Sequence, residues 1–252
     1  MDGESKMSRA GKTGSASVLT DEQLQMVLKT ILGSGSTHAS RNYLIIVLSH
    51  LCGLRSQELA SLKVIDVWIG GRVVDTLRLV GSYTKGNKHR DIPLTNPKVV
   101  SAIEQHISDQ SQVRGRFVEP SGPLFKSQKG RFFSPNSMVH LIKRIYDDAG
   151  FRNASSHSGR RKFATTLIEQ GADINCVKLL MGHSSIQTTA LYYSTSPKRL
   201  ANLMSSLQMW LDVMFKMGLV NDGIEYTNPR RQGDGLDIGS WKLLGMRGSH
   251  FV

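Results

Sequence analysis

Apolar residues recur with helical spacing over most of the chain. The first such stretch follows Thr20-Asp21-Glu22-Gln23, which has the spacing of a capping box, and its apolar residues repeat at steps of three and four. Similar patterns predict further helices at about 40–52, 56–62, 97–111, 135–149, 158–170, 174–181, 185–193 and 198–217. The hydrophobic pattern therefore predicts a mostly helical protein.

The period of the pattern changes between residues 64 and 94. Aliphatic and β-branched runs at 64–69, 72–80 and 90–94 are separated by Gly70-Gly71 and by Thr84-Lys85-Gly86-Asn87-Lys88. Runs of this kind between turn residues are typical of strands joined by hairpins. The sequence thus predicts an α+β fold, mostly helical, with a small three-stranded antiparallel sheet that places Lys85 in a hairpin.

The two ends of the chain differ from its middle. Residues 1–17 have almost no apolar side chains that could offset the entropy of ordering, and we expect a flexible leader there. Residues 218–252 are rich in Gly, Asn, Asp and Arg, and we expect an irregular tail. The folded part is expected to be a single domain over 18–217 that includes a C-terminal helix.

The composition fits a soluble protein of the cytoplasm. Of the 252 residues, 39% are hydrophobic, and no apolar run is long enough for a membrane helix or a signal peptide. Cys52 and Cys176 do not form a CxxC pair, and we expect reduced cysteines that pack as small apolar residues.

The charge indicates the class of partner. The formal net charge is +12, which favours a polyanionic partner such as nucleic acid. A basic RNA-binding protein or a solvated basic surface would have the same balance. The charge alone does not select an activity.

Candidate chemistry gathers between Ser156 and Tyr193. The stretch contains His157-Ser158-Gly159-Arg160, then Met181-Gly182-His183, then the adjacent tyrosines Tyr192 and Tyr193. Two histidines, an arginine and a tyrosine in this order could bind a phosphate and attack it. A tyrosine has a pKa near 10, so attack at neutral pH needs a strongly cationic pocket, and the planar fork of arginine suits that task.

Together with Gly53-Leu54-Arg55-Ser56-Gln57-Glu58-Leu59 and the lysine-bearing turn at 84–88, these motifs resemble the tyrosine recombinase (phage integrase) family, with the motif spacing of its Xer-like members. The resemblance implies the catalytic fold of that family. It also implies a role for each matched residue: Arg55 and Arg160 hold the phosphate, Lys85 is the general acid, His157 and His183 assist, Tyr192 is the nucleophile, and Glu58 supports the site.

The same resemblance implies a site-specific DNA recombinase of the integrase or invertase type that works through a 3′-phosphotyrosyl intermediate. Its implied partners are double-stranded DNA, further copies of the chain as a dimer to tetramer on DNA, and possible accessory DNA-bending proteins. No cofactor or metal is implied, and the location would be nucleoid-associated. Most family members carry an N-terminal core-binding domain, and we expect that domain to be absent from this chain.

Other readings remain open at this stage. Taken singly, Arg55 and Glu58 could form a structural salt bridge, His157 and His183 could be core histidines or a metal pair, and Lys85 could be a solvated hairpin charge. Tyr193 could replace Tyr192 as the nucleophile. The whole chain could instead be a type IB topoisomerase-like enzyme or a catalytically silent DNA-binding module, and the C-terminal helix could pack in cis or in trans.

Overall fold

The computed structural model describes residues 17–83, 89–112 and 118–193, together with positions 204, 205, 209 and 214. The chain divides into two compact units, Met1–Met204 and Ser205–Val252. The described positions from 204 onward are helical, as the pattern after Ser196-Pro197 predicts. The architecture below is that of the first unit.

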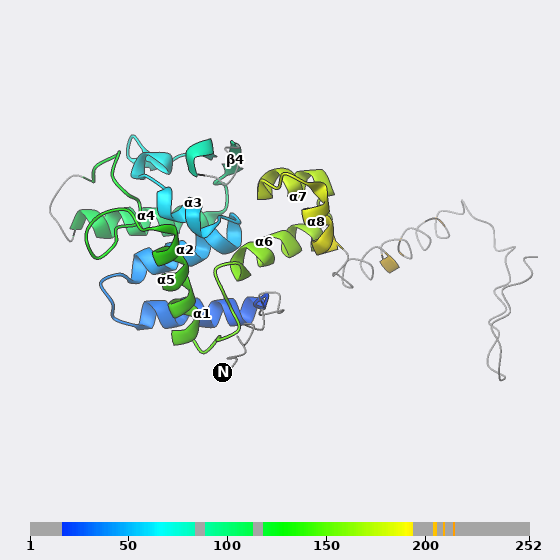
Figure 1. The fold of residues 1–252 in the computed structure, drawn as a ribbon, viewed down its shortest axis with the longest axis horizontal. Helices are drawn as coiled ribbons and strands as arrows, with labels where there is room; N and C mark the ends of the chain where they lie inside the picture. The colour runs from blue at the N-terminus through cyan, green and yellow to red at the C-terminus, as the bar shows by residue number, and fades with distance from the viewer. Residues whose placement is uncertain are drawn as a thin grey trace, which may run out of the picture. The chain divides into compact units, whose positions relative to one another are not determined.

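Eight helices are seen in the described part of the first unit, and each matches a predicted helix (Figure 1). They are α1 (Asp21–Gly33), α2 (Ala39–Leu51), α3 (Ser56–Ser61), α4 (Pro97–Gln112), α5 (Pro135–Asp148), α6 (Ser158–Glu169), α7 (Ile174–Met181) and α8 (Ile186–Tyr193).

Local side-chain chemistry fixes where several of these helices begin. The Thr20 hydroxyl accepts a hydrogen bond from the Gln23 backbone N–H at 3.3 Å, and the Gln23 side chain accepts one from the Thr20 N–H at 3.0 Å. This reciprocal pair satisfies two backbone donors that α1 leaves unpaired. At α5, the Ser134 hydroxyl accepts a hydrogen bond from the Ser137 backbone N–H at 3.1 Å, just before Pro135 starts the helix.

The strands form two two-stranded antiparallel sheets within the described residues. One pairs β1 (Trp68–Ile69) with β2 (Arg72–Val73), and the other pairs β3 (Thr76–Leu79) with β4 (Arg90–Pro93). The prediction of one three-stranded sheet was wrong in this detail. The pairing partner of the backbone changes between residues 74 and 75. The Val74 N–H bonds to the carbonyl of Val67, just before β1, whereas the Asp75 carbonyl accepts from the N–H of Leu94, just after β4.

The predicted strand at 64–69 is also mostly absent. Residues Val64–Asp66 form the 3₁₀ helix η1, and a second 3₁₀ helix, η2, spans Gly81–Tyr83. Backbone N–H groups of Val64 and Ile65 bond to the carbonyls of Gly122 and Pro120, and the Asp66 carboxylate accepts from the Lys63 N–H. These contacts satisfy the backbone without a ladder, so Val64 and Val67 are buried on a turn instead of a strand, while Ile65 is exposed.

Helix α2 is the centre of the main hydrophobic core. Four of its side chains, Leu44, Ile45, Ile46 and Leu48, are completely buried. It contacts α1, α4, α5 and α6, and Figure 1 shows it in the middle of these helices. A separate small cluster of Ala164, Ile168, Val177 and Met181 joins α6 to α7. The part of the fold that carries the His, Gly-His and Tyr motifs therefore has a core of its own.

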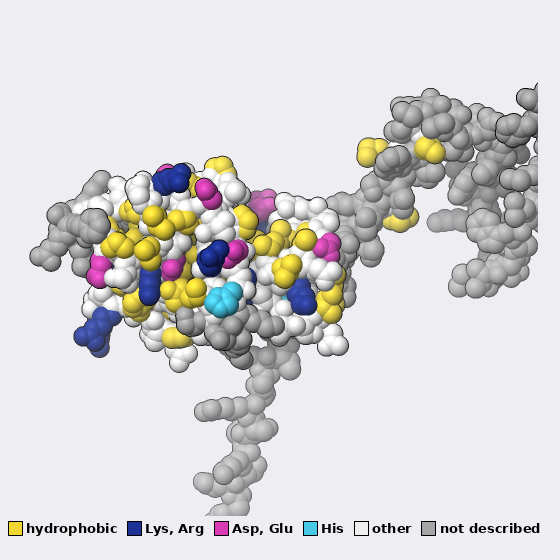
Figure 2. Space-filling view, turned by 90° about the horizontal axis from the view of Figure 1, so that it is seen from above, with side chains coloured by type: hydrophobic (Ala, Val, Ile, Leu, Met, Phe, Trp, Pro, Cys, Tyr) yellow, Lys and Arg dark blue, Asp and Glu magenta, His cyan; other side chains and the backbone are white. Residues whose placement is uncertain are grey.

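Charged and apolar side chains are mixed on the surface. On the face seen in Figure 2, lysine and arginine side chains stand apart from one another and do not form one continuous patch. None of the helices in the described ranges is long and apolar enough to cross a membrane.

Candidate active site

A glycine turn between α2 and α3 brings the two candidate arginines together. Gly53 has a φ of +63°, and a Cβ built there would lie 2.4 Å from Cδ1 of Phe163 in α6. Only glycine meets both demands without strain. The Gly53 carbonyl accepts a hydrogen bond from Nη1 of Arg160 at 2.6 Å, so the turn that precedes Arg55 also holds Arg160.

Arg55 lies at the N-cap of α3 and is the more accessible of the two. Its Nη1 donates to Oε1 of Glu58 at 3.0 Å, and its Nη2 donates to the Gly182 carbonyl at 3.1 Å. The side chain is 27% exposed. Arg55 is therefore held in one orientation while part of its guanidinium still faces solvent.

Arg160, in the first turn of α6, lies beneath the surface with 5% of its area exposed. Its second donor, Nη2, bonds to the carbonyl of Met181 at the end of α7. Burial, together with the nearby charges of Arg55 and Arg90, lowers the pKa of Arg160 to about 9, although Glu58 and Tyr192 oppose the shift. The guanidinium stays charged at neutral pH and ties α6 to the end of α7.

Glu58 is completely buried and is shared by two arginines. Its carboxylate accepts from Nη1 and Nη2 of Arg90 at 2.5 and 2.7 Å, in addition to the bond from Arg55. Burial alone would raise the pKa of Glu58, but the hydrogen bonds and charge of Arg90 and Arg55 bring it below its usual value. Arg160 does not bond to Glu58 but feels its charge, so among the described residues three guanidinium groups share the field of one carboxylate and the cluster has an excess of positive charge.

His183 and Tyr192 lie side by side next to this cluster. Helix α7 ends at Gly182 in the left-handed conformation, and His183 follows with Nδ1 2.9 Å from the hydroxyl of Thr189 in α8. The rings of His183 and Tyr192 are almost parallel, with 9° between their planes and 6.2 Å between centroids. Burial, together with the charges of Arg160, Arg55 and Arg90, lowers the pKa of His183 to about 4. Its imidazole is therefore neutral at pH 7.

The structure gives less information on His157, Lys85 and Tyr193 than on the other candidate residues. His157 is the N-cap residue of α6 with an exposed side chain, and its backbone N–H donates to the Ser155 hydroxyl at 3.3 Å. Within the described part of the structure, its ring makes no hydrogen bond to Arg160. Lys85 and the side chain of Tyr193 lie outside the described residues. The roles of these three residues stay predictions.

The structure adds groups that the motifs do not reveal by themselves. The carbonyls of Gly53, Met181 and Gly182 orient the arginines, Thr189 orients His183, and Arg90 binds Glu58. Of these, only Arg90 had a signal in the sequence. It belongs to the same segment as Lys85, Thr84-Lys85-Gly86-Asn87-Lys88-His89-Arg90.

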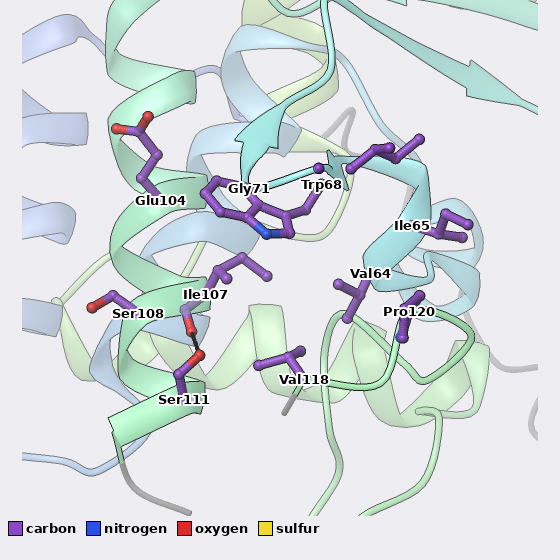
Figure 3. Close-up of a pocket in the computed structure, with 12 residues that line it drawn as sticks. Val64, Ile65, Trp68, Gly71, Glu104, Ile107, Ser108, Ser111, Val118 and Pro120 are labelled. Atoms are coloured by element: carbon purple, nitrogen blue, oxygen red, sulfur yellow. Dashed lines mark hydrogen bonds between the residues drawn. The ribbon is translucent and has the colours of Figure 1, made fainter. Parts of the chain in front are cut away.

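A hollow of about 750 Å3 lies elsewhere and is mostly apolar (Figure 3). Its lining includes Trp68 of β1, Ile107 of α4 and Pro120 of the segment that follows α4. None of the candidate residues lines it. In the chain as described, no three His, Cys, Asp or Glu side chains are grouped as metal ligands would be.

Comparison with known proteins identifies the family. The model of the phage integrase family matches residues 17–199, which is most of the chain and includes every candidate residue. The chain belongs to the phage integrase family. Membership explains why arginine, histidine and tyrosine motifs far apart in the sequence meet in one place.

The most similar relatives include two Xer proteins. The chain is 32% identical over 187 residues to tyrosine recombinase XerC of Pseudomonas fluorescens, covering 74% of this chain and 58% of the relative. It is 34% identical over 172 residues to tyrosine recombinase XerD of Pseudomonas putida, covering 67% of this chain and 54% of the relative. The chain therefore spans just over half the length of each.

Solved structures establish the fold. The XerA recombinase superposes with a TM-score of 0.60 at 20% identity, over 75% of this chain and 64% of that one. The catalytic domain of bacteriophage HP1 integrase superposes with a TM-score of 0.51 at 17% identity, over 76% of this chain and 95% of that one. XerH bound to its difH substrate before cleavage superposes with a TM-score of 0.55 at 25% identity, over 70% of this chain and 49% of that one. The predicted fold class, a mostly helical tyrosine recombinase catalytic fold, is confirmed.

Proposed function

We propose that this chain is the catalytic part of a site-specific DNA recombinase that cuts and rejoins double-stranded DNA through a 3′-phosphotyrosyl intermediate. The observation that carries the proposal is the cationic cluster of Arg55, Arg160 and Arg90 around Glu58, with Tyr192 stacked on His183 beside it. Its excess positive charge suits a phosphodiester, and the tyrosine supplies a nucleophile. The Xer relatives, which are tyrosine recombinases by name, agree with this assignment.

In the proposed reaction, Arg55 and Arg160 bind the non-bridging oxygens of the scissile phosphate. Arg55 has solvent access for this, and Arg160 supplies charge from a position where burial strengthens its field. The charge that develops on these oxygens during displacement is then stabilised by donors that are already oriented by Glu58 and by backbone carbonyls.

The phenol oxygen of Tyr192 attacks phosphorus, and the bond to the 5′-oxygen of the next nucleotide breaks. The phenol proton passes to an acceptor, for which neutral His183 is suited, with His157 as a second assisting histidine. Lys85 gives a proton to the departing 5′-oxygen. A 5′-hydroxyl from another strand then attacks the phosphotyrosine and releases Tyr192, so the bond energy is conserved and no nucleotide cofactor or metal is consumed.

Recombination joins ends from two DNA sites, so the proposal includes assembly of the chain as a dimer to tetramer on DNA, with accessory DNA-bending proteins as possible helpers. A DNA substrate supports the proposed location, which is the cytoplasm in association with the nucleoid. Integration or inversion of a mobile element is the proposed type of reaction.

Covalent capture in cells tests the proposal. Wild type, Tyr192→Phe and Tyr193→Phe are expressed, the cells are lysed in denaturant, and DNA that stays attached to the protein is sequenced. We expect adducts at a few defined positions with wild type and with Tyr193→Phe, and none with Tyr192→Phe, because phenylalanine lacks the attacking oxygen.

The other outcomes are equally informative. Adducts scattered over the genome would support a topoisomerase-like enzyme. Loss of adducts in all three proteins would contradict the catalytic proposal and favour a silent DNA-binding module.

A further inference from the structure

Arg90 is the first residue of β4, and only 6% of its side chain is exposed. A buried arginine must have a partner, because an unpaired buried charge is very costly. The partner is Glu58, which lies 32 positions away in α3 and accepts hydrogen bonds from both terminal nitrogens of the guanidinium. We propose that Arg90 is a positioning residue that sets Arg55 for the phosphate by acting through Glu58; this inference rests on the recombinase function proposed above.

The carboxylate of Glu58 is the link between the two arginines. Oε1 accepts from Nη1 of Arg90 at 2.5 Å and from Nη1 of Arg55 at 3.0 Å. Oε2 accepts from Nη2 of Arg90 and from the backbone N–H of Arg55, both at 2.7 Å. The planar fork of Arg90 fixes the plane of the carboxylate, and that plane fixes both the backbone and the guanidinium of Arg55.

Arg90 also lies against the second group that orients Arg55. The carbonyl of Gly182 accepts from Nη2 of Arg55 at 3.1 Å. A Cβ built on Gly182 would be 3.0 Å from Nη1 and 3.1 Å from Cδ of Arg90. The backbone of Gly182 therefore packs directly on Arg90, which supports both acceptors of the Arg55 guanidinium.

The shared carboxylate has an electrostatic consequence. With Glu58 and Arg55 alone, the two charges would cancel, and Arg55 would attract a phosphate weakly. Arg90 supplies the counter-charge for Glu58, so the charge of Arg55 is left available for an anionic ligand. Lysine at position 90 would keep the charge but not the two parallel hydrogen bonds, so it separates geometry from charge.

The test uses nicked duplexes built on the DNA positions recovered with the wild-type protein. Single-turnover formation of the covalent adduct and DNA affinity are measured for wild type, Arg90→Lys, Arg55→Ala and the double variant. We expect Arg90→Lys to slow adduct formation about tenfold or more, the loss typical of a misplaced catalytic group, while the dissociation constant changes less than about threefold. In the Arg55→Ala background, Arg90→Lys should cause almost no further loss.

A matched control comes from the paired strand. Arg78 on β3 forms an ion pair with Asp91 at 3.4 Å, and its side chain is 75% exposed. Arg78→Lys makes the same substitution on the neighbouring strand. Because an exposed ion pair contributes little, this variant should cleave DNA at the wild-type rate.

Three results would overturn the inference: a wild-type rate for Arg90→Lys, a full extra loss when it is combined with Arg55→Ala, or rescue of Arg90→Lys by a 5′-bridging sulfur at the cut. Sulfur leaves without a proton, so rescue would show that Arg90 serves the general acid instead of Arg55. Absence of wild-type cleavage would refute the recombinase function, and this inference with it.

Arg90→Lys is checked by thermal unfolding. If that variant does not fold, Glu58→Met combined with Arg90→Met removes both buried charges and keeps an apolar filling, which proteins often tolerate. This double variant should fold and lose at least tenfold in cleavage, because Arg55 is no longer oriented. Wild-type cleavage by it would also contradict the positioning role.

Discussion

At the scale of single residues, the site is assembled largely by backbone carbonyls. Arg160 is held by the carbonyls of Gly53 and Met181, and Arg55 by that of Gly182. These contacts join three chain segments that are far apart in the sequence. The orientation of each guanidinium is therefore set before any ligand arrives, which is how preorganised electrostatic stabilisation works.

Arg160→Ala should abolish most of the cleavage while the fold survives. The substitution removes a buried charge that no other described group replaces, and loss of one preorganised donor costs about 10²–10³ in rate. Adduct formation on nicked DNA gives the rate, and circular dichroism reports the fold. A rate close to wild type would contradict the assignment of Arg160 to the phosphate.

The sequence allowed prediction of side chains whose chemistry is evident from residue type and order. Arg55, Glu58, Arg160, His183 and Tyr192 are indeed gathered in one place. Carbonyl acceptors could not be predicted because every residue has one, and their use depends on tertiary contacts. Arg90 was missed because a strand arginine next to a lysine-rich turn looks like a solvated charge, and only the fold shows that it is buried against Glu58.

At the scale of elements, the close contact between α2 and α6 sets the position of the His-x-x-Arg motif. A Cβ built on Gly159 would lie 2.3 Å from Oγ of Ser49 and 2.7 Å from Nδ1 of His50. Helix α6 can approach α2 this closely only because residue 159 has no side chain. Since Arg160 follows directly, the glycine also determines where that guanidinium lies.

Gly159→Ala should therefore reduce both stability and cleavage. Overpacking a tight interface costs about 1–3 kcal/mol, and the shift of α6 would displace Arg160. Urea unfolding and adduct formation measure the two effects. Gly33→Ala is the matched control, because no atom lies within 4 Å of a Cβ there. Equal stability of the two variants would show that α6 does not depend on this contact.

The buried His50 predicts a dependence of stability on pH. Burial lowers the pKa of His50 to about 4, while an unfolded histidine titrates near 6.5. Between these values the unfolded chain binds more protons than the folded one, so stability falls as the pH drops below about 6.5. By pH 4 the loss from this group is on the order of 3 kcal/mol.

Urea unfolding between pH 4 and 7 checks this dependence. His50→Leu should have a flatter pH profile than wild type, while His140→Gln, which changes an exposed histidine, should keep the wild-type slope. Identical profiles for wild type and His50→Leu would contradict the account.

The difference between predicted and observed strands also belongs to this scale. An aliphatic run at 64–69 has the composition of a strand, yet the N–H groups of Val64 and Ile65 bond to carbonyls at 122 and 120. Strand formation depends on a partner backbone that the local sequence does not contain. Helix boundaries were predicted better because capping groups such as Thr20 and Ser134 act locally.

For the whole molecule, the formal charge of +12, the phage integrase fold and the arginine cluster agree with the proposed DNA substrate. In that proposal the basic charge would give general attraction to DNA, and the cluster would provide the local binding of a single phosphate. The proposal therefore predicts that surface charge governs DNA affinity and that the cluster governs cleavage.

In the proposed recombinase reaction, the phenol oxygen of Tyr192 becomes joined to DNA. The most direct measurement is mass spectrometry of the covalent adduct after nuclease and trypsin digestion. Trypsin releases residues 179–198 as one peptide, in which Tyr192 and Tyr193 are the two tyrosines. The account predicts a nucleotide phosphate on Tyr192, and a phosphate on Tyr193 or on a residue outside this peptide would contradict it.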